Sequence, residues 1–291
     1  MKILIVGSTG MLGYSLFNSL SSYSEHDVYG TVRSIEGKER FFNKFQSNII
    51  PNIDITNIEE LDLIIGKIKP NVVINCIGLI KQHEKENSTI ESIYINALFP
   101  HQLASLCDKN AVKLIHFSTD CVFSGNKGGY CENDTPDAPS MYGRTKLIGE
   151  IDDDKHLTLR TSIIGHELSS TVSLIDWFLN QENSTNGFTK AIFSGIPTCH
   201  IAKVLNDYVL PNYNLTGLFH LSVEPINKYD LLKKVSFQYG KEIEINESDT
   251  FVTNKSLDST LFMKITGYRP PSWDSLVKEM HVDYMKTYQV N

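Results

Sequence analysis

The sequence contains no long apolar run and no excess of basic residues. A membrane-spanning helix needs roughly 20 consecutive apolar residues, and no segment of the 291 residues approaches this length. The 34 acidic residues outnumber the 27 Lys and Arg residues, which leaves a net charge of −7. Proteins that bind nucleic acids or acidic membranes usually carry a basic face. We therefore expect no membrane span and no nucleic-acid partner.

Cysteine is scarce and follows no metal-binding pattern. The five cysteines form no CxxC pair and have no histidines at ligand-like spacing, so neither structural zinc nor a disulfide framework is indicated. The first residues, MKILIV, are too short for a signal-peptide core and lead straight into glycines. These features predict a reduced, cytoplasmic protein without a metal.

Apolar segments of strand length alternate with helical patterns over the first two-thirds of the chain. The run ILIVG (3–7) is unbroken, as a parallel strand covered on both faces requires. Thr56 followed by Glu59 resembles a capping box at the start of a helix. The expected strands are 3–7, 27–32, one within 48–55, 71–78, 112–118 and 157–164, with helices between them, including 89–108. This order predicts an α/β fold, a doubly wound parallel sheet of the Rossmann type.

The pattern changes after residue 165. A turn-rich stretch, ENSTNGF (182–188), is followed by short apolar segments and by helices at 228–239 and 272–286. We predict a Rossmann domain over 1–165 and a smaller α+β domain over 166–291, which closes over the carboxyl edge of the sheet and holds the substrate. Some later segments are expected to return to the first domain.

A glycine-rich loop, GSTGMLG (7–13), directly follows the first strand and opens the first helix. Glycines permit a tight turn and a close backbone approach, so that the helix N-terminus faces a pyrophosphate. The strand–loop–helix context favours dinucleotide binding over a glycine turn that only packs a helix. The predicted contacts in this loop are Gly7, Thr9, Gly10, Met11, Leu12 and Gly13.

The end of the second strand bears on which dinucleotide binds. NAD-binding proteins usually carry an acidic residue there, whereas NADP-binding proteins tend to carry a cation. Here Arg33 follows the strand, and Asp27 lies too early to replace the acid. We predict NADPH, with NADH as the alternative, because an exposed Arg can simply be solvated. Further predicted cofactor contacts are Asp54 and Ile55 near the adenine, and Cys76, Ile77 and Gly78 in the cleft.

The segment YGRTK places Tyr142 and Lys146 four residues apart, on one face of a predicted helix. An ammonium this close stabilises a phenolate, so we expect Lys146 to lower the pKa of Tyr142. Such pairs are often only surface neighbours, but here a strand ending in Thr119 precedes them by about two dozen residues. We predict that these three residues are catalytic and that Tyr142 and Lys146 also contact the cofactor.

The segments GSTGMLG, FSTDCVFSG, YGRTK and LRTSIIG together resemble the extended short-chain dehydrogenases/reductases that act on nucleotide-sugars. The closest resemblance is to the dTDP-4-dehydrorhamnose reductase family, over essentially the whole chain. It implies reduction of the C4 keto group of a dTDP- or UDP-linked 4-keto-6-deoxy sugar, with or without a 2-acetamido group, for surface polysaccharide precursors. It also implies that Tyr142 donates the proton, Thr119 hydrogen-bonds the reacting oxygen, and Lys146 orients the ribose.

Two positions depart from the pattern of that family. Ile163 and Ile164 stand where the family typically has an aromatic pair, whose Trp lines the sugar site. Some family members dimerise through a metal bound partly by an acid on the first helix, and this helix, YSLFNSL, contains no acid. The exact sugar, metal-dependent dimerisation and the presence of a homodimer therefore stay open.

The residue at position 121 differs between related enzymes that catalyse dehydration, epimerisation or reduction of nucleotide-sugars. Nucleotide-sugar 4,6-dehydratases have a Glu at this position, and without it the base for elimination is missing. In GDP-fucose synthases a Cys and a His epimerise the sugar, and Cys121 with His166 would suit a bifunctional 3,5-epimerase/4-reductase. The alternatives are a packing role for Cys121 and a loop hydrogen bond for His166. A third hypothesis is a non-catalytic NADP-binding regulatory subunit, which would not require the catalytic triad.

Several loop side chains are candidates for contact with the nucleotide-sugar, and each could equally be a solvated or packing side chain. They are Lys81, Gln82, Cys121, Ile163, His166, Thr198 and Lys255.

Overall fold

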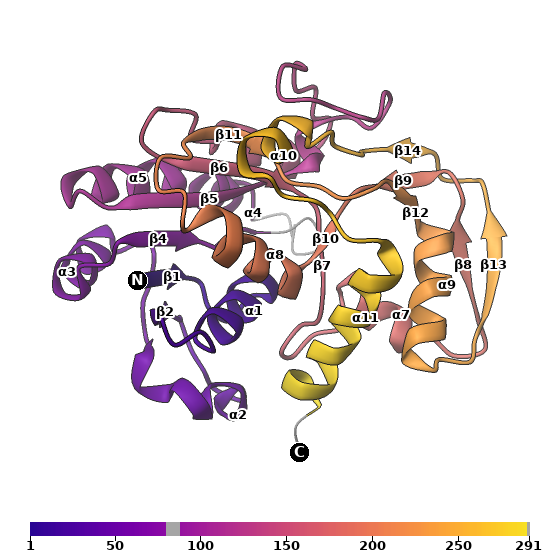
Figure 1. Ribbon diagram of the computed structural model, residues 1–291, viewed down its shortest axis with the longest axis horizontal. Helices are drawn as coiled ribbons and strands as arrows, with labels where there is room; N and C mark the ends of the chain where they lie inside the picture. The colour runs from indigo at the N-terminus through magenta and orange to yellow at the C-terminus, as the bar shows by residue number, and fades with distance from the viewer. Residues whose placement is uncertain (80–87, 290–291) are drawn as a thin grey trace.

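In the computed structural model, which describes residues 1–79 and 88–289, the chain is built around one seven-stranded sheet whose neighbouring strands all run parallel (Figure 1). The strands in spatial order are β11 (Gly217–His220), β6 (Leu157–Thr161), β5 (Lys113–Thr119), β4 (Val72–Asn75), β1 (Lys2–Val6), β2 (Asp27–Thr31) and β3 (Ile49–Ile50). The order reverses between β1 and β4, as in a doubly wound Rossmann sheet. The predicted fold class is confirmed.

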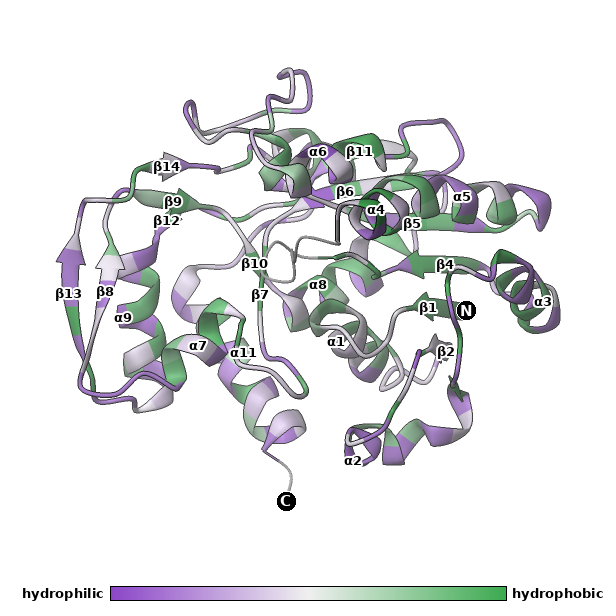
Figure 2. Ribbon diagram, turned by 180° about the vertical axis from the view of Figure 1, so that it is seen from behind, coloured by the Kyte–Doolittle hydropathy of each residue, from purple (hydrophilic) through white to green (hydrophobic). Residues whose placement is uncertain are grey.

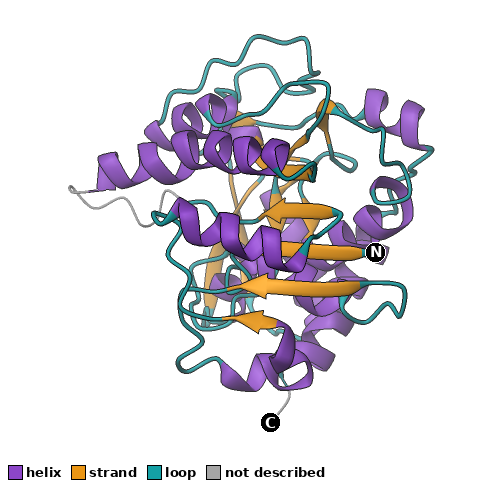
Figure 3. Cartoon of the chain, turned by 90° about the vertical axis from the view of Figure 1, so that its left-hand side faces the viewer, coloured by secondary structure: helices purple, strands orange, loops and turns teal. Residues whose placement is uncertain are grey.

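Both faces of the sheet are buried under helices. Because consecutive residues of a strand point to opposite sides, each strand contributes side chains to both buried faces. In β1, Ile3 and Ile5 belong to one apolar core, and Leu4 and Val6 belong to the other. Helices α1 (Met11–Leu20) and α8 (Thr198–Val204) contribute to the first core, and α3 (Ile58–Ile68) and α5 (Phe99–Lys109) to the second. Figure 3 shows helices in front of the strands and behind them.

The later part of the chain adds small sheets beside the large one (Figures 1 and 2). Their strands are β7 (Ile163–Ile164) with β10 (Ile196–Pro197), β8 (Ser184–Phe188) with β13 (Glu244–Ser248), and β9 (Ala191–Phe193) between β12 (Ile226–Asn227) and β14 (Thr253–Asn254). The remaining α-helices are α2 (Glu39–Phe42), α4 (Ser88–Ile93), α6 (Met141–Ile148), α7 (Leu174–Leu179), α9 (Lys228–Tyr239), α10 (Thr260–Thr266) and α11 (Trp273–Asp283). The later part of the chain also returns to the large sheet, since β11 is its edge strand and α8 packs on α1.

The predicted strand 157–164 is in fact two strands. The first, β6, ends at Thr161, and β7 then pairs with β10 in a separate small sheet. Between them the Ser162 carbonyl accepts a hydrogen bond of 2.8 Å from the Ile196 N–H. The break directs the residues after Ser162 away from the large sheet. The stretch 182–188, predicted to be turns, also differs, because most of it forms β8 and pairs with β13.

Two helix predictions need correction. The helix predicted over 89–108 contains a π-helical turn, Tyr94–Leu98, between α4 and α5. Pro100 lacks an N–H and cannot make the regular hydrogen bond to the preceding turn, which explains an irregular turn there. Helix α3 is capped by Asn57, which accepts from the Glu60 N–H, and not by Thr56.

Among the residues that the structure describes, no helix is long and apolar enough to cross a membrane. Within the same residues, no group of three or more His, Cys, Asp or Glu side chains is placed to hold a metal ion.

Candidate active site

The glycine loop forms a bare helix N-terminus at the carboxyl edge of the sheet. Gly7 follows β1 with φ of +94°, a conformation that favours glycine. A side chain on Gly13 would overlap the Gly7 carbonyl, so the loop can fold back on itself only with glycine there. Gly10 caps α1 without a side-chain hydrogen bond, and among the described residues no side chain bonds to the first N–H groups of the helix. These N–H groups are therefore left for an anion.

The end of β4 forms the wall beside this loop. Asn75 is buried, and its side-chain oxygen accepts from the Ile77 N–H at 3.0 Å. Ile77 packs against Gly7, where an added Cβ would lie 2.5 Å from the Ile77 Cγ1. Cys76 is partly buried, and burial raises the pKa of its thiol while Lys146 opposes the rise. The structure thus brings the predicted contacts of β4 and of the glycine loop together.

Arg33 and Asp54 lie near each other at the surface beyond β2 and β3. The pKa of Asp54 is lowered by hydrogen bonds from Thr56 and, to a smaller degree, by the charge of Arg33. Asp54 thereby stabilises the turn that leads to α3. Ile55 is partly buried, and its carbonyl accepts from the Tyr94 hydroxyl at 3.3 Å.

Thr119 ends β5 and caps the short 3₁₀ turn Asp120–Val122. Its hydroxyl accepts from the Cys121 N–H at 3.1 Å and lies 3.2 Å from the Asp120 carboxylate, to which it donates. The side chains of Thr119 and Asp120 are both buried. The Thr119 hydroxyl is therefore held in a defined place at the carboxyl end of the central part of the sheet.

Helix α6 carries Tyr142 and begins close to the Thr119 hydroxyl. Ser140 caps the helix by accepting from the Gly143 N–H at 3.1 Å. A side chain on Gly143 would overlap the Cys121 carbonyl, so only glycine lets the helix start against the turn that follows Thr119. The Tyr142 phenol thereby lies within reach of the Thr119 hydroxyl, which opposes the rise that burial causes in the pKa of the phenol. Glycine at position 143 is a requirement that the sequence motif alone did not reveal.

The pKa of Tyr142 in the protein alone is raised, and the predicted lowering by Lys146 does not occur. Burial is the largest cause, and the neighbouring Cys121 adds to it. The phenol therefore keeps its proton at neutral pH. A protonated phenol can donate a proton but cannot accept one.

Lys146 lies one helical turn beyond Tyr142 and is 5% exposed. Its ammonium donates to the Phe117 carbonyl of β5 at 2.7 Å. Burial lowers its pKa to about 8, and Glu150 and, to a smaller degree, Cys76 oppose this effect. A buried lysine with so low a pKa is poised to change charge near physiological pH.

Two further lysines face the turn after Thr119. Lys255 packs its side chain over Gly125, and Lys228 lies with its ammonium 3.9 Å from the centre of the Phe193 ring. Burial raises the pKa of Asp120, and both lysines oppose this rise. Lys255 was predicted from the sequence and Lys228 was not. The signal that could have found Lys228 is the pairing of β12 with β9, which sequence spacing does not show.

The profile of the RmlD substrate binding domain matches residues 1–285 of the chain. The chain belongs to the RmlD substrate binding domain family. The match covers the Rossmann sheet and the small sheets, so both parts of the site described above lie within the family region.

Three comparisons illustrate the membership. The dTDP-4-dehydrorhamnose reductase of Aggregatibacter actinomycetemcomitans is 23% identical over 305 residues, which cover 96% of this chain and 98% of that protein. The Methionine adenosyltransferase 2 subunit beta of Danio rerio is 23% identical over 79% of this chain and 71% of that protein. A crystal structure of dTDP-4-dehydrorhamnose reductase from Bacillus anthracis, in complex with NADP, superposes with a TM-score of 0.80 at 21% identity, over 97% of this chain and 99% of that one. Two other curated relatives, one of them 31% identical, align over only 48% and 45% of their length, so the chain spans about half of each.

Cys121 and His166, considered above as an epimerase pair, have separate surroundings. Burial raises the pKa of the Cys121 thiol to about 11, and Asp120 adds to the rise. His166 is buried, and its ring nitrogens contact Asp176 at 2.5 Å and the Tyr239 hydroxyl at 2.9 Å. The imidazole thus has both nitrogens engaged, and the thiol is protonated at neutral pH.

The other candidate contacts are distributed over several elements. Thr198 begins α8, and a Cβ on Gly165 would lie 2.6 Å from its hydroxyl and 3.5 Å from Met11. The segment that follows β7 therefore meets the start of α1, next to the glycine loop. Ile163 is half-buried in β7. Lys81 and Gln82 lie outside the described residues.

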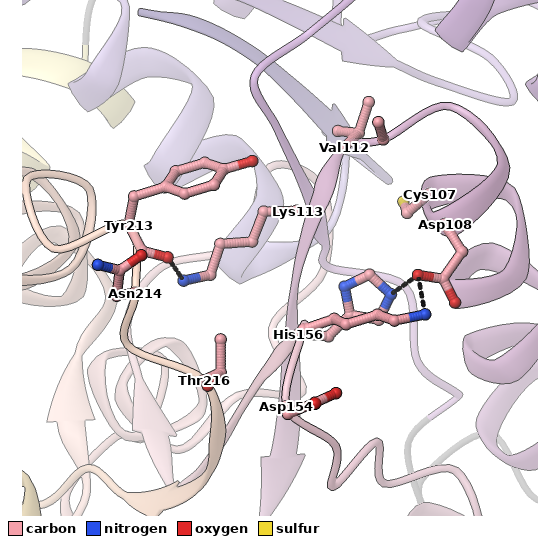
Figure 4. Close-up of a pocket in the computed structure, with 11 residues that line it drawn as sticks. Cys107, Asp108, Val112, Lys113, Asp154, His156, Tyr213, Asn214 and Thr216 are labelled. Carbon is pink, nitrogen blue, oxygen red and sulfur yellow. Dashed lines mark hydrogen bonds and ion pairs between the residues drawn. The ribbon is translucent and has the colours of Figure 1, made fainter.

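A cavity of about 420 Å³ opens at the opposite edge of the sheet (Figure 4). It lies where β5 and β6 begin, and Lys113, His156 and Tyr213 are among its lining residues. In Figure 4 the Lys113 ammonium points toward the Tyr213 backbone, and His156 points toward Asp108, 3.8 Å away. Ligands of open parallel sheets bind at the carboxyl ends of the strands. The catalytic candidates lie at that end and not at this cavity.

Proposed function

We propose that the protein is a nucleotide-sugar ketoreductase that uses NADPH to reduce the C4 keto group of a dTDP- or UDP-linked 4-keto-6-deoxy sugar. One observation carries the proposal: the Tyr142 phenol lies within reach of the Thr119 hydroxyl at the carboxyl end of β5, and Lys146, one helical turn further along α6, holds its buried ammonium against the Phe117 carbonyl of the same strand. Together they offer a hydrogen-bond donor, a proton donor and a cation. The relatives named dTDP-4-dehydrorhamnose reductase support this reaction class.

The residues around the glycine loop fit a dinucleotide. The uncapped N-terminus of α1 suits its diphosphate, and Gly7 and Gly13 allow the close approach. Arg33 lies exposed beyond β2, where a cation favours the 2′-phosphate of NADPH over NADH. When bound, the cofactor supplies the hydride that adds to C4.

The side chains of the protein would manage the charge that develops on the sugar oxygen. Tyr142 enters the reaction protonated, since burial raises its pKa, and donates its proton to the forming alkoxide. The Thr119 hydroxyl, now turned to Asp120, can rotate its single proton to the same oxygen. Lys146, whose buried ammonium bonds to the Phe117 carbonyl, would hold the nicotinamide ribose.

The second side of the site would hold the nucleotide-sugar. Lys228 and Lys255 place two ammonium groups opposite the turn after Thr119, where the diphosphate of the substrate needs positive charge. Ile163 offers an aliphatic surface in place of an aromatic one. The two lysines and Ile163 are therefore candidates for the residues that determine which nucleotide-sugar binds.

Two other functions receive less support. Epimerisation needs a base with a free lone pair, whereas the Cys121 thiol is protonated and both His166 nitrogens are engaged. A role as a subunit of another enzyme is favoured by the similarity to the protein named Methionine adenosyltransferase 2 subunit beta. The geometry of Thr119, Tyr142 and Lys146 has no purpose in a purely binding module.

The purified protein should be tested with NADPH and with NADH against a panel of dTDP-, UDP- and GDP-linked 4-keto-6-deoxy sugars. We expect one sugar to cause rapid loss of the absorbance of NADPH, and slower loss with NADH. If every sugar leaves NADPH unconsumed while NADPH itself binds, the regulatory role replaces the reductase.

A further inference from the structure

Arg160, from the segment LRTSIIG, lies in a buried ion pair that the catalytic mechanism does not use. It donates from Nε and from one Nη to the two carboxylate oxygens of Glu150, at 2.7 Å each. The side chains of Arg160 and Glu150 are each only 6% exposed. Glu150 belongs to the loop after α6, and Arg160 belongs to β6. The pair therefore connects the helix that carries Tyr142 with the strand next to β5.

The remaining polar atoms of this pair are also satisfied. The Ser118 hydroxyl donates to the Glu150 carboxylate at 2.6 Å, and Arg160 reaches the His220 Nε2 at 3.3 Å. The guanidinium also lies 5.4 Å from the centre of the Phe123 ring. Burial lowers the pKa of His220 to about 4, so the ring is neutral and accepts from Arg160. Such a network fixes its members in one arrangement.

Stability alone is a weak explanation for a buried ion pair. Removing two charges from water costs about as much as their attraction returns, and well-packed apolar residues often do as well. The position of Glu150 suggests another role. It bonds to the Ser118 hydroxyl of β5, and the Lys146 ammonium bonds to the carbonyl of the adjacent Phe117, so both side chains meet β5 at neighbouring residues.

Three titratable groups interact electrostatically with the Lys146 ammonium, which itself donates to the Phe117 carbonyl. Cys76 comes from the end of β4, His116 from β5, and Glu150 from the end of α6. His116 is neutral, because burial and Lys146 lower its pKa far below the usual value, and the Cys76 thiol keeps its proton at neutral pH. Glu150 is thus the source of negative charge in this set, and it opposes the effect of burial on Lys146.

We propose that Glu150 is a positioning residue of the active site: held by Arg160 and Ser118, its carboxylate keeps the nearby Lys146 ammonium charged. Ser118 precedes Thr119, so the same carboxylate also anchors the end of β5. The inference rests on the proposed function only in assigning Lys146 to the nicotinamide ribose. It explains why both partners of the ion pair lie so close to the catalytic residues.

The test requires a variant that removes the charge of Glu150 without unfolding the protein. Glu150→Gln alone would leave the Arg160 guanidinium buried without a counter-ion, which is strongly destabilising. The double variant Glu150→Gln with Arg160→Met removes both charges and avoids that cost. Glu279→Gln is a matched control, because Glu279 is also paired with a basic group, His200 at 2.9 Å, on elements other than α6.

The measurement is the Kd for NADPH as a function of pH, followed by fluorescence, which needs no sugar substrate. In the unaltered protein we expect affinity to fall as pH rises through the pKa of Lys146, which is about 8. In the double variant the fall should begin at lower pH. At about pH 8.5 its Kd should be several-fold higher than that of the unaltered protein, up to roughly tenfold for each unit of change in the pKa, and near about pH 6.5 the two should agree.

The outcomes separate this inference from the proposed function. The same pH dependence in the double variant and in the unaltered protein, or an equal loss of affinity at every pH, would overturn the role of Glu150 alone. Failure of the unaltered protein to bind NADPH would overturn the proposed function and the inference together. Glu279→Gln should follow the unaltered protein at every pH.

Discussion

Two buried lysines lie at opposite ends of β5 and differ in what surrounds them. Lys113 begins the strand, and its ammonium donates to the carbonyls of Tyr213 and Leu215. Lys146 lies beside the other end, and its ammonium donates to the Phe117 carbonyl. Each is 5% exposed, and burial lowers the pKa of each to about 8.

The comparison teaches that a buried lysine with a shifted pKa is not by itself a functional site. At Lys113 burial is the whole cause of the shift, and the ammonium ties a loop to the sheet. At Lys146 a carboxylate opposes the shift, and the same helix carries Tyr142, whose phenol lies within reach of the Thr119 hydroxyl. The neighbours of the lysine, and not its own pKa, distinguish chemistry from structure.

Tyr142→Phe should produce the largest effect at the catalytic end of the strand. Loss of a positioned proton donor should lower kcat by about 10²- to 10⁴-fold. The Kd for NADPH should stay the same, because the ring is retained. Steady-state kinetics and fluorescence titration check the two expectations, and full activity of this variant would refute the mechanism.

Replacing each lysine by Met compares the two ends of β5 directly. We expect Lys146→Met to lower kcat by about a hundredfold. Lys113→Met should leave kcat unchanged but reduce the free energy of unfolding by about 1–3 kcal/mol, since two buried carbonyls lose their donor. Kinetics and urea unfolding distinguish these results. A loss of kcat in Lys113→Met equal to that in Lys146→Met would erase the distinction.

Gly143→Ala tests whether the catalytic end depends on the close contact of α6 with the turn after Thr119. The new methyl group would overlap the Cys121 carbonyl, so we expect a loss of stability of about 1–3 kcal/mol and a clear fall in kcat. Gly66→Ala in α3 is the control, because its Cβ would meet open space. That change should raise stability by up to about 1 kcal/mol. Thermal unfolding of both variants measures the difference.

The pH dependence of kcat should report Lys146 and not Tyr142. The ammonium is charged below its pKa of about 8 and neutral above it, so kcat should fall as pH rises through this value. The phenol, whose pKa is raised, still carries its proton there. Lys146→Arg keeps its charge to higher pH, so its kcat, even if lower, should not fall near pH 8. If kcat of Lys146→Arg still falls near pH 8, the fall belongs to the titration of another group.

Cys121→Ala should have the smallest effect. A thiol that only packs can be replaced at a cost of less than about threefold in kcat, well under 1 kcal/mol. Loss of all turnover in this variant would instead make the thiol a catalytic group, as in an epimerase.

The sequence predicted the elements whose function depends on local spacing. The glycine loop, the strand ending in Thr119 and the row from Tyr142 to Lys146 are each contained within a few residues, so their pattern indicates their geometry. The order of strands and helices likewise predicted the doubly wound sheet.

What the sequence did not predict depends on contacts between distant segments. Lys228 reaches the site because β12 pairs with β9, and two-residue strands have no recognisable pattern. The break at Ser162 follows from the pairing of β7 with β10, which competes with the large sheet for the same residues. The pKa of Tyr142 was predicted in the wrong direction, because burial, which no spacing reveals, raises it, and Cys121 and Asp120 add to the rise.

The most direct test of the central claim is to follow the hydrogen that the reaction adds to the sugar. NADPH carrying deuterium at C4 of the nicotinamide should be used with whichever 4-keto sugar is turned over, and the product analysed by NMR. The account predicts one deuterium at C4 of the sugar, and, in a parallel reaction in deuterated water, none at C3 or C5. Absence of the label from C4, or solvent deuterium at C3 or C5, would contradict a simple ketoreductase built on Thr119, Tyr142 and Lys146.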